Sequence, residues 1–302
     1  MSFIAWIYLL LLSFIWGASF YFIEVGLVYL SPAWLVSLRL CSAAIILSAY
    51  LFIRGRFLPT SLAFWGAVGV MGAINNLLPF FLIAWGQVFV TGGMASIINA
   101  NTAFFGVLIS AIFLQAEPLR LHRLVGGGPG IAGGATAIGV EAIEGTSASI
   151  YGSLAILGAT LSYALAGVWG RLKLASWPAM EVACGMLICS ASLSVPAGFI
   201  LSGMPSLSLF QPENLPALLQ LIIGIGILGT ALAYPLYFRI LALAGASNLL
   251  LVTIIVPIFA VGLDAALLGQ WVGARQLAGF GLVAIGLAIM DGRYRRPKSR
   301  NN

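Results

Sequence analysis

Two amides and a proline interrupt an otherwise apolar stretch, GAINNLLPFFL, which runs from Gly72 to Leu82. An unpaired amide in an apolar environment is strongly unfavourable, so Asn75 and Asn76 should face protein or water rather than lipid. Pro79 has no N–H to offer the carbonyl of Asn75, which predicts a kink at this point of a helix. The freed carbonyl and the two side chains would then offer hydrogen bonds to a small polar solute.

Other polar and aromatic residues also fall in the middle of apolar segments. Asn99 and Asn101 would lie about 200° apart around a helix, so at most one should face a shared cavity. An apolar, aromatic wall with few polar groups is typical of a pocket for a small organic molecule. Ordinary packing of the aromatic residues and helix–helix hydrogen bonds of the asparagines are the structural alternatives. The predicted substrate-binding residues are Trp16, Asn75, Asn76, Pro79, Trp85, Asn99, Asn101, Tyr163, Trp169, Tyr234 and Tyr237.

The composition requires a membrane around these residues. Hydrophobic residues make up 61% of the 302 positions and charged residues 7%, whereas a soluble domain carries about a quarter charged residues. The apolar runs are long and continuous, as spanning helices need, and do not alternate as barrel strands do. We therefore expect an all-α integral membrane protein. Ten transmembrane helices are predicted, near 3–29, 33–53, 62–89, 92–115, 121–140, 150–172, 179–202, 215–241, 246–268 and 273–291.

The distribution of charge predicts the orientation of these helices. With the N-terminus in the cytoplasm, 12 of the 14 basic residues fall on the cytoplasmic side, which agrees with the excess of Lys and Arg in cytoplasmic loops. Both termini are therefore predicted to be cytoplasmic, in a multi-pass protein of the inner (plasma) membrane. The basic tail would anchor this topology and contact anionic lipid of the bilayer. No nucleic-acid partner is expected.

Charged residues inside spanning segments are functional candidates by default. Arg39 is expected to reach outward or to pair with Glu24, and Arg239 to pair with Glu181. No carboxylate falls convincingly at the midplane. The sequence therefore leaves open whether transport would be coupled to protons or would be facilitated diffusion.

An internal repeat relates the two halves of the chain. The stretches 115–133 and 268–286 align at an offset of 153 residues, which pairs Gly126 with Gly279 and Gly133 with Gly286. Five helices per half is an odd number, so the second half would enter the membrane upside down, as in many secondary transporters. The predicted organisation is a first five-helix repeat at 1–145, an inverted second repeat at 146–292 and a basic cytoplasmic tail at 293–302.

Several of these segments resemble EamA-type proteins of the drug/metabolite transporter superfamily. The resemblance is carried by WGASF at 16–20, SPAWLVSLRL at 31–40, Glu117 at the end of the fourth helix and LLLVTIIVPIFAVGLDAALLGQ at 249–270. It implies ten helices in an inverted 5+5 arrangement around a central cavity. It also implies export of small metabolites, as in the YddG-type amino-acid exporters.

The function predicted from these features is transport of small organic metabolites, foremost amino acids including aromatic and hydrophobic ones, by alternating access through the central cavity. A nucleotide-sugar or drug-like solute transporter of the same superfamily is the alternative, and a channel is a further one. An enzyme is not expected, because the lone His122 lies in a loop and no metal cluster or nucleophile–base pair is evident. No metal or cofactor is predicted, and the sequence leaves the oligomeric state open, a monomer included.

Overall fold

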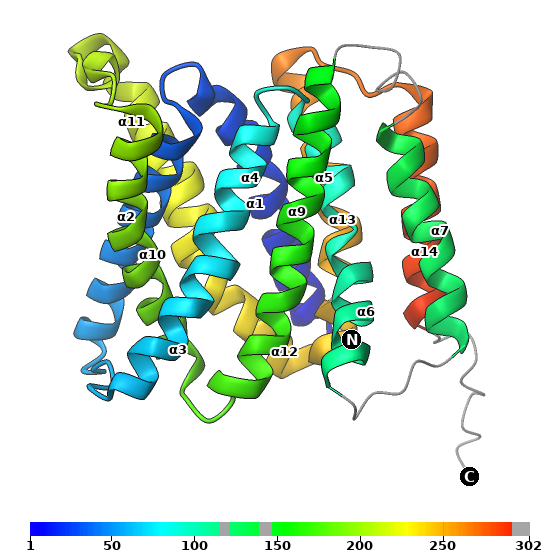
Figure 1. Ribbon diagram of the computed structural model, residues 1–302, viewed down its shortest axis with the longest axis horizontal. Coiled ribbons are helices and arrows are strands. Elements are labelled where there is room, and N and C mark those ends of the chain that lie inside the picture. Colours follow the sequence, from blue (N-terminus) through cyan, green and yellow to red (C-terminus); the bar gives the residue numbers. More distant parts are fainter. Residues whose placement is uncertain (115–120, 139–146, 250, 292–302) are drawn as a thin grey trace.

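A bundle of long helices makes up the computed structural model, which describes residues 1–114, 121–138, 147–249 and 251–291 (Figure 1). These residues contain helices and no strand, which confirms the all-α class for the described part of the chain. Among the described residues, eight helices of 18 or more residues are apolar enough to cross a membrane, and Ala274–Met290 is a shorter apolar helix. Large apolar side chains also face outward, with Leu62 88% and Phe3 80% exposed, as expected for a surface that contacts lipid.

The chain order of the elements follows the apolar segments of the sequence. The first part contains α1 (Phe3–Leu27), α2 (Pro32–Ile53), α3 (Leu62–Gly72), η1 (Ala73–Leu77), α4 (Leu78–Gly86), α5 (Gly92–Asn99), α6 (Thr102–Phe113) and α7 (Leu121–Ile138). The second part contains α9 (Ser147–Trp169), η2 (Gly170–Leu174), α10 (Ala179–Ser202), η3 (Leu207–Phe210), η4 (Pro212–Asn214), α11 (Leu215–Leu221), η5 (Ile222–Leu232), α12 (Ala233–Leu249), α13 (Leu251–Leu263), η6 (Asp264–Leu268) and α14 (Ala274–Asp291).

Hydroxyl side chains define where the early helices begin. Ser2, Ser31, Ser61 and Thr91 each accept a hydrogen bond from a backbone N–H three residues further on. Such caps satisfy donors that the first turn of a helix leaves free. The breaks that the sequence predicts after residues 29, 53 and 89 therefore have a local physical cause.

Wide π-helical turns occur within four of the spans, at η1, η2, η5 and η6. The first of them precedes Pro79, which cannot donate the hydrogen bond that a regular helix would need. The carbonyl of Ile74 in this turn accepts a hydrogen bond from the Ser162 hydroxyl of α9 at 2.6 Å. The distortion predicted from Pro79 is therefore present as a π-turn whose widened backbone bonds a neighbouring helix.

Two other spans differ from the sequence prediction. The single helix predicted over 92–115 is divided, because α5 ends at Asn99 and α6 begins at Thr102. The eighth span was predicted to end at 241, but its helix continues to a break at Gly245, where φ is 77°. Glycine tolerates this left-handed φ without a clash of its own Cβ.

The helices pack in a consistent set of pairs. α2 lies against α10, α1 against α13, and α9 against α4 and α6. α7 and α14 form a pair at one edge of the bundle, on the right in Figure 1. The site described below lies in the larger body of the bundle, away from this edge pair.

Glycines bring α7 and α14 into close contact. A methyl group added to Gly126 would lie 2.6 Å from the carbonyl oxygen of Gly286, and one added to Gly133 would lie 2.5 Å from that of Gly279. Contacts this short are possible only between residues without a Cβ, as in other small-residue interfaces of membrane helices. These glycines therefore hold the edge pair together by backbone packing.

Basic residues gather at one end of the bundle. The connection between α2 and α3 contains Arg54 and Arg56, and it lies at the same end of the bundle as the N-terminus (Figure 1). The connection between α9 and α10, which follows Lys173, lies at this end too. The predicted tail at 293–302 and the predicted boundary between residues 145 and 146 lie outside the described residues.

Candidate substrate-binding site

Asn76 is the centre of a hydrogen-bonded group inside the bundle. Its side chain is fully buried, and its Nδ2 donates to the Ser190 hydroxyl of α10 at 3.3 Å. Its Oδ1 accepts from the Tyr234 hydroxyl of α12 at 2.9 Å and from Asn75 Nδ2 at 3.2 Å. The π-turn η1 thus directs both predicted amides towards helices of the second half rather than towards lipid.

Arg39 is a second buried polar residue of the interior, with 8% of its surface exposed. Its Nε donates to the Thr230 hydroxyl at 2.8 Å and its Nη2 to the Gly229 carbonyl at 3.4 Å, both in η5. The guanidinium carbon lies 3.7 Å from the centre of the Phe80 ring, which is a cation–π contact. The outward reach or pairing with Glu24 that the sequence suggests for Arg39 is therefore wrong.

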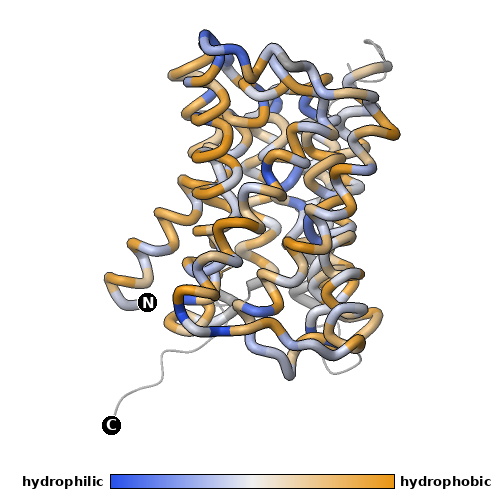
Figure 2. The backbone as a smooth tube through the Cα atoms, turned by 90° about the vertical axis from the view of Figure 1, so that its left-hand side faces the viewer, coloured by the Kyte–Doolittle hydropathy of each residue, from blue (hydrophilic) through white to orange (hydrophobic). Residues whose placement is uncertain are grey.

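These two groups belong to one region. Tyr163 and Tyr234 lie within electrostatic range of Arg39, and Tyr234 is joined to Asn76, and through it to Asn75, by hydrogen bonds. We call these five residues, Arg39, Asn75, Asn76, Tyr163 and Tyr234, the central polar cluster. Figure 2 shows hydrophilic positions midway along the otherwise hydrophobic bundle. Sequence reasoning predicted four of the five members and omitted Arg39 from the binding site.

Two predicted aromatic residues form a separate pair, and a third predicted residue adjoins the cluster. Trp16 of α1 and Tyr237 of α12 have ring centroids 6.2 Å apart and an interplanar angle of 39°. Both rings are half-buried, and Tyr237 follows Tyr234 on the same helix. Pro79 is buried next to Phe80, the ring beneath Arg39.

The remaining predicted residues make contacts elsewhere. Trp169 Nε1 donates to the Ala67 carbonyl of α3 at 2.9 Å, and the Trp85 ring packs against Phe89 with centroids 5.0 Å apart. Asn101 Nδ2 donates to the Ile98 carbonyl at 2.9 Å.

The two asparagines of the fourth span differ in their surroundings. Asn101 packs against Gly134 of α7, and its backbone is part of the break between α5 and α6. Asn99 Oδ1 is buried and has no hydrogen-bond partner among the described residues. The structure therefore does not bring either of these amides into the contacts of the central polar cluster.

Half-buried Glu24 and buried Asp264 lie near the ends of their spans. Glu24 accepts from the Gly92 N–H and from Gln270 Nε2, and Asp264 accepts from the Gly93 N–H. Both carboxylates thus satisfy free donors at the start of α5, where the helix dipole also favours negative charge.

Glu181 was expected to pair with Arg239, and this expectation is wrong. Arg56 contacts Glu181 through two hydrogen bonds, of 2.6 and 2.8 Å, whereas Arg239 is exposed on α12. Within the part of the chain that the structure describes, Arg56–Glu181 is the one ion pair.

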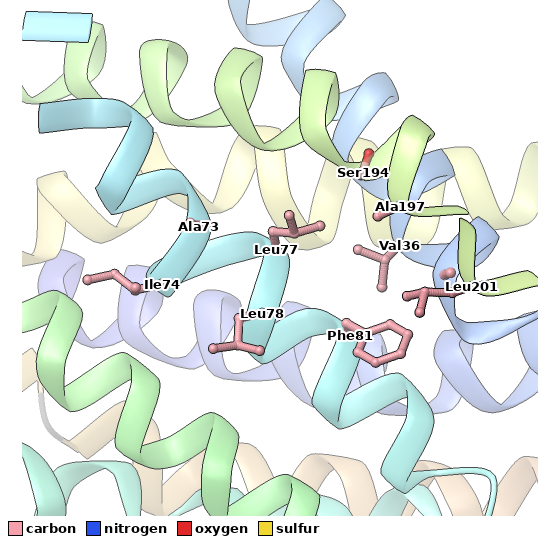
Figure 3. Close-up of a pocket in the computed structure, with 10 residues that line it drawn as sticks. Val36, Ala73, Ile74, Leu77, Leu78, Phe81, Ser194, Ala197 and Leu201 are labelled. Carbon is pink, nitrogen blue, oxygen red and sulfur yellow. The ribbon is translucent and has the colours of Figure 1, made fainter. Parts of the chain in front are cut away.

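An apolar pocket of about 260 Å³ lies on a different face of the same π-turn. Figure 3 shows its lining, which comes from α2, from the turn and α4, and from α10. Leu78 and Leu201 on its rim are 46% and 59% exposed, so the pocket opens at the surface of the bundle. None of the predicted substrate-binding residues lines it.

Comparison with known proteins identifies the family. The EamA-like transporter family matches the chain twice, over residues 3–138 and 150–290, and the protein belongs to this family. It is 27% identical to the uncharacterized inner membrane transporter YedA of Escherichia coli K12, over 95% of this chain and 90% of that protein. It is also 27% identical to a probable amino-acid metabolite efflux pump of Salmonella typhimurium, over 93% of this chain and 92% of that protein.

A solved crystal structure has the same fold. It superposes with a TM-score of 0.63 at 20% identity and covers 97% of this chain and 98% of its own. The family and its relatives make this protein a multi-span membrane transporter of small metabolites, and membership of a transporter family points away from an enzyme.

Proposed function

We propose that this protein carries amino acids, including aromatic and hydrophobic ones, across the inner membrane by alternating access, as an exporter or a facilitator. The central polar cluster is the observation that carries the proposal. It is enclosed by apolar helices and offers amide, hydroxyl and guanidinium groups, which match the polar ends of an amino acid. Nearby aromatic rings, among them Trp16 and Tyr237, would contact an apolar side chain.

We further propose an inverted arrangement of five helices and five helices, with a division near residues 145 and 146. The contacts between α7 and α14 support it. The offset of 153 residues converts Gly126 into Gly279 and Gly133 into Gly286, so it exchanges the observed contacts 126–286 and 133–279 with each other. Such an exchange is expected when a two-fold axis in the membrane plane relates the two helices.

The other helix pairs support the same symmetry. The offset carries α1 onto the region of α9, and carries the span of α5 and α6 onto α13. The contact of α1 with α13 therefore corresponds to the contact of α9 with α5 and α6, and both contacts are present. A symmetric scaffold of this kind would let the two halves rock about a midplane site.

The burial of Asn76 and Arg39 supports alternating access. With 0% and 8% of their surfaces exposed, these two side chains become accessible to a solute mainly when the surrounding helices separate. We place both termini in the cytoplasm, because the basic α2–α3 and α9–α10 connections lie at the end of the bundle where the N-terminus lies (Figure 1).

The alternatives are weaker on the observations at hand. Nucleotide sugars carry two phosphates, whereas the cluster holds a single cation, Arg39. A cationic drug would be repelled by the same residue. A channel would need polar rings along an open path, but Asn76 and Arg39 of the cluster are buried, with 0% and 8% of their surfaces exposed.

Transport by the purified protein in liposomes tests this proposal. We expect labelled phenylalanine, leucine or a related amino acid to equilibrate faster than in protein-free vesicles. Unlabelled amino acid of the same kind on the opposite side of the membrane should accelerate the movement of the labelled one. Under alternating access, the site can return across the membrane occupied by the unlabelled molecule.

Two results would contradict the proposal. If no amino acid of a complete panel moves faster than in protein-free vesicles, the substrate class is wrong. If ions and unrelated solutes pass at rates that rise with concentration without saturation, the protein is a channel and not a carrier.

A further inference from the structure

Arg39 has a full charge and no counter-ion among the described residues. Glu24 and Asp264 bind the start of α5, and Glu181 binds Arg56. Burial of a cation away from water is unfavourable unless an anion compensates it. The charge balance of the interior is therefore incomplete, and a bound anion would complete it.

The guanidinium group also has hydrogen-bonding capacity left over. Arg39 carries five N–H donors, and its protein contacts are the bonds from Nε to Thr230 and from Nη2 to Gly229. The Nη1 amino group has no partner among the described residues, and it is not one of the fully enclosed polar atoms. The planar fork of an arginine is well suited to a carboxylate, which accepts two parallel hydrogen bonds.

The contacts of Arg39 hold this fork in a fixed orientation. Thr230 and Gly229 bind it from η5, and the Phe80 ring lies against its face. Tyr163 of α9 and Tyr234 of α12 lie within electrostatic range of its charge. Helices α2, α4, α9 and α12 and the turn η5 therefore converge on one cation.

We propose that Arg39 binds the carboxylate of the transported solute, with the Tyr163 and Tyr234 hydroxyls completing the subsite. The inference rests on the proposed transport of amino acids and adds the group by which they are recognised. Organic carboxylates with one negative charge are thus the ligands of this site. An amide or an amine of the same shape leaves the arginine uncompensated and is rejected.

Binding to the purified wild-type protein provides the first test. Phenylacetate has a carboxylate and no amino group, and phenylacetamide replaces that carboxylate by a neutral amide. We expect phenylacetate to raise the melting temperature in detergent and phenylacetamide not to do so. Equal stabilisation by both compounds, or none by either, would overturn the proposal without use of any variant.

Transport by substituted protein provides the second test. Wild-type protein should prefer phenylalanine over phenylalaninamide, and Arg39→Gln should reduce that preference about tenfold or more, the size expected for loss of a charge-assisted hydrogen bond. Arg39→Lys keeps the charge without the planar fork and should retain part of the preference. Arg239→Gln removes an exposed cation from α12 and should leave the ratio unchanged.

The possible outcomes separate this inference from the proposed function. Equal losses for the acid and the amide in Arg39→Gln would make Arg39 a tether between α2 and η5, and the carboxylate subsite would be wrong while amino-acid transport stands. The protein could instead be stabilised by phenylacetate in a manner that depends on Arg39, yet transport no amino acid. The anion site would then stand, and the proposed substrate class would be wrong.

Discussion

The two wide turns η1 and η5 occupy comparable places in the two halves of the chain, yet they use different residues. η1 has the sequence AINNL and η5 the sequence IIGIGILGTAL. The amides of η1 bond to α10 and α12. The glycines of η5 let α1 and α2 approach, because a methyl group on Gly226 would overlap the Ser42 hydroxyl.

This difference indicates how a symmetric scaffold can hold an asymmetric site. A π-turn widens the helix and frees backbone and side-chain groups from the regular pattern. In η1 the freed groups form polar contacts in the interior, whereas in η5 they allow close packing and bind Arg39 through Thr230 and Gly229. Substitutions in η5 should therefore affect stability first, and substitutions in η1 should affect transport first.

The largest effect is expected for Gly224→Ala in η5. An added methyl group would lie 2.6 to 2.7 Å from three carbons of the Phe22 ring, including Cγ. Cγ is fixed close to the backbone, so the ring cannot simply swing aside. We expect a loss of about 1–3 kcal/mol in stability, as is typical of overpacking, measured as a lower melting temperature in detergent.

Gly69→Ala is the matched control for this substitution. Gly69 lies in α3, just before η1, and a methyl group there would meet no atom within 4 Å. It should leave the melting temperature unchanged or slightly raise it, because alanine favours helix. Similar melting temperatures for the two variants would contradict the assignment of η5 as a packing surface.

Asn76→Ala in η1 should have the next largest effect, mainly on transport. The substitution removes the partner of Ser190, Tyr234 and Asn75 at once. We expect the transport rate per folded molecule to fall about tenfold or more, since three hydrogen bonds of the site are lost. Flux should be measured after normalising for the amount of protein in the liposomes.

Asn248→Ala serves as the control, because Asn248 Nδ2 donates to the Ala244 carbonyl across the break at Gly245 and, among the described residues, forms no hydrogen bond with the central polar cluster. It should not change flux. If Asn76→Ala lowers the melting temperature but leaves the normalised flux intact, Asn76 is a helix–helix contact, which is the structural alternative left open by the sequence.

The sequence predicts the helices well because their signals are local. Length, hydropathy and the hydroxyl caps lie within each segment, so the predicted helix at 179–202 matches α10 residue for residue. Asn75, Asn76 and Pro79 are detectable for the same reason, since an amide in an apolar run is unusual wherever it points.

Arg39 could not be assigned in this way. Its partner Thr230 lies 191 residues away, and Glu24, the apparent counter-ion, is bound by Gly92 and Gln270, the latter 246 residues away. Pairings across the two halves depend on how the helices are arranged, which composition and spacing do not specify. The same limit applies to Trp85 and Trp169. Like Trp16, they fall in the middle of apolar segments, but they contact Phe89 and Ala67 and not the Trp16–Tyr237 pair.

The smallest effect is expected for Tyr234→Phe. The substitution removes one hydroxyl, which donates to Asn76 Oδ1, and keeps the ring. Asn76 Oδ1 still accepts from Asn75, so no buried acceptor is left without a partner. We expect the half-saturating concentration of substrate to rise about threefold, as for loss of one neutral hydrogen bond. Tyr151→Phe, at a position 58% exposed on α9, should show no change. A loss as large as that of Asn76→Ala would mean that the Tyr234 hydroxyl contributes as much to transport as the η1 amide, and the division of roles between η1 and α12 would then be wrong.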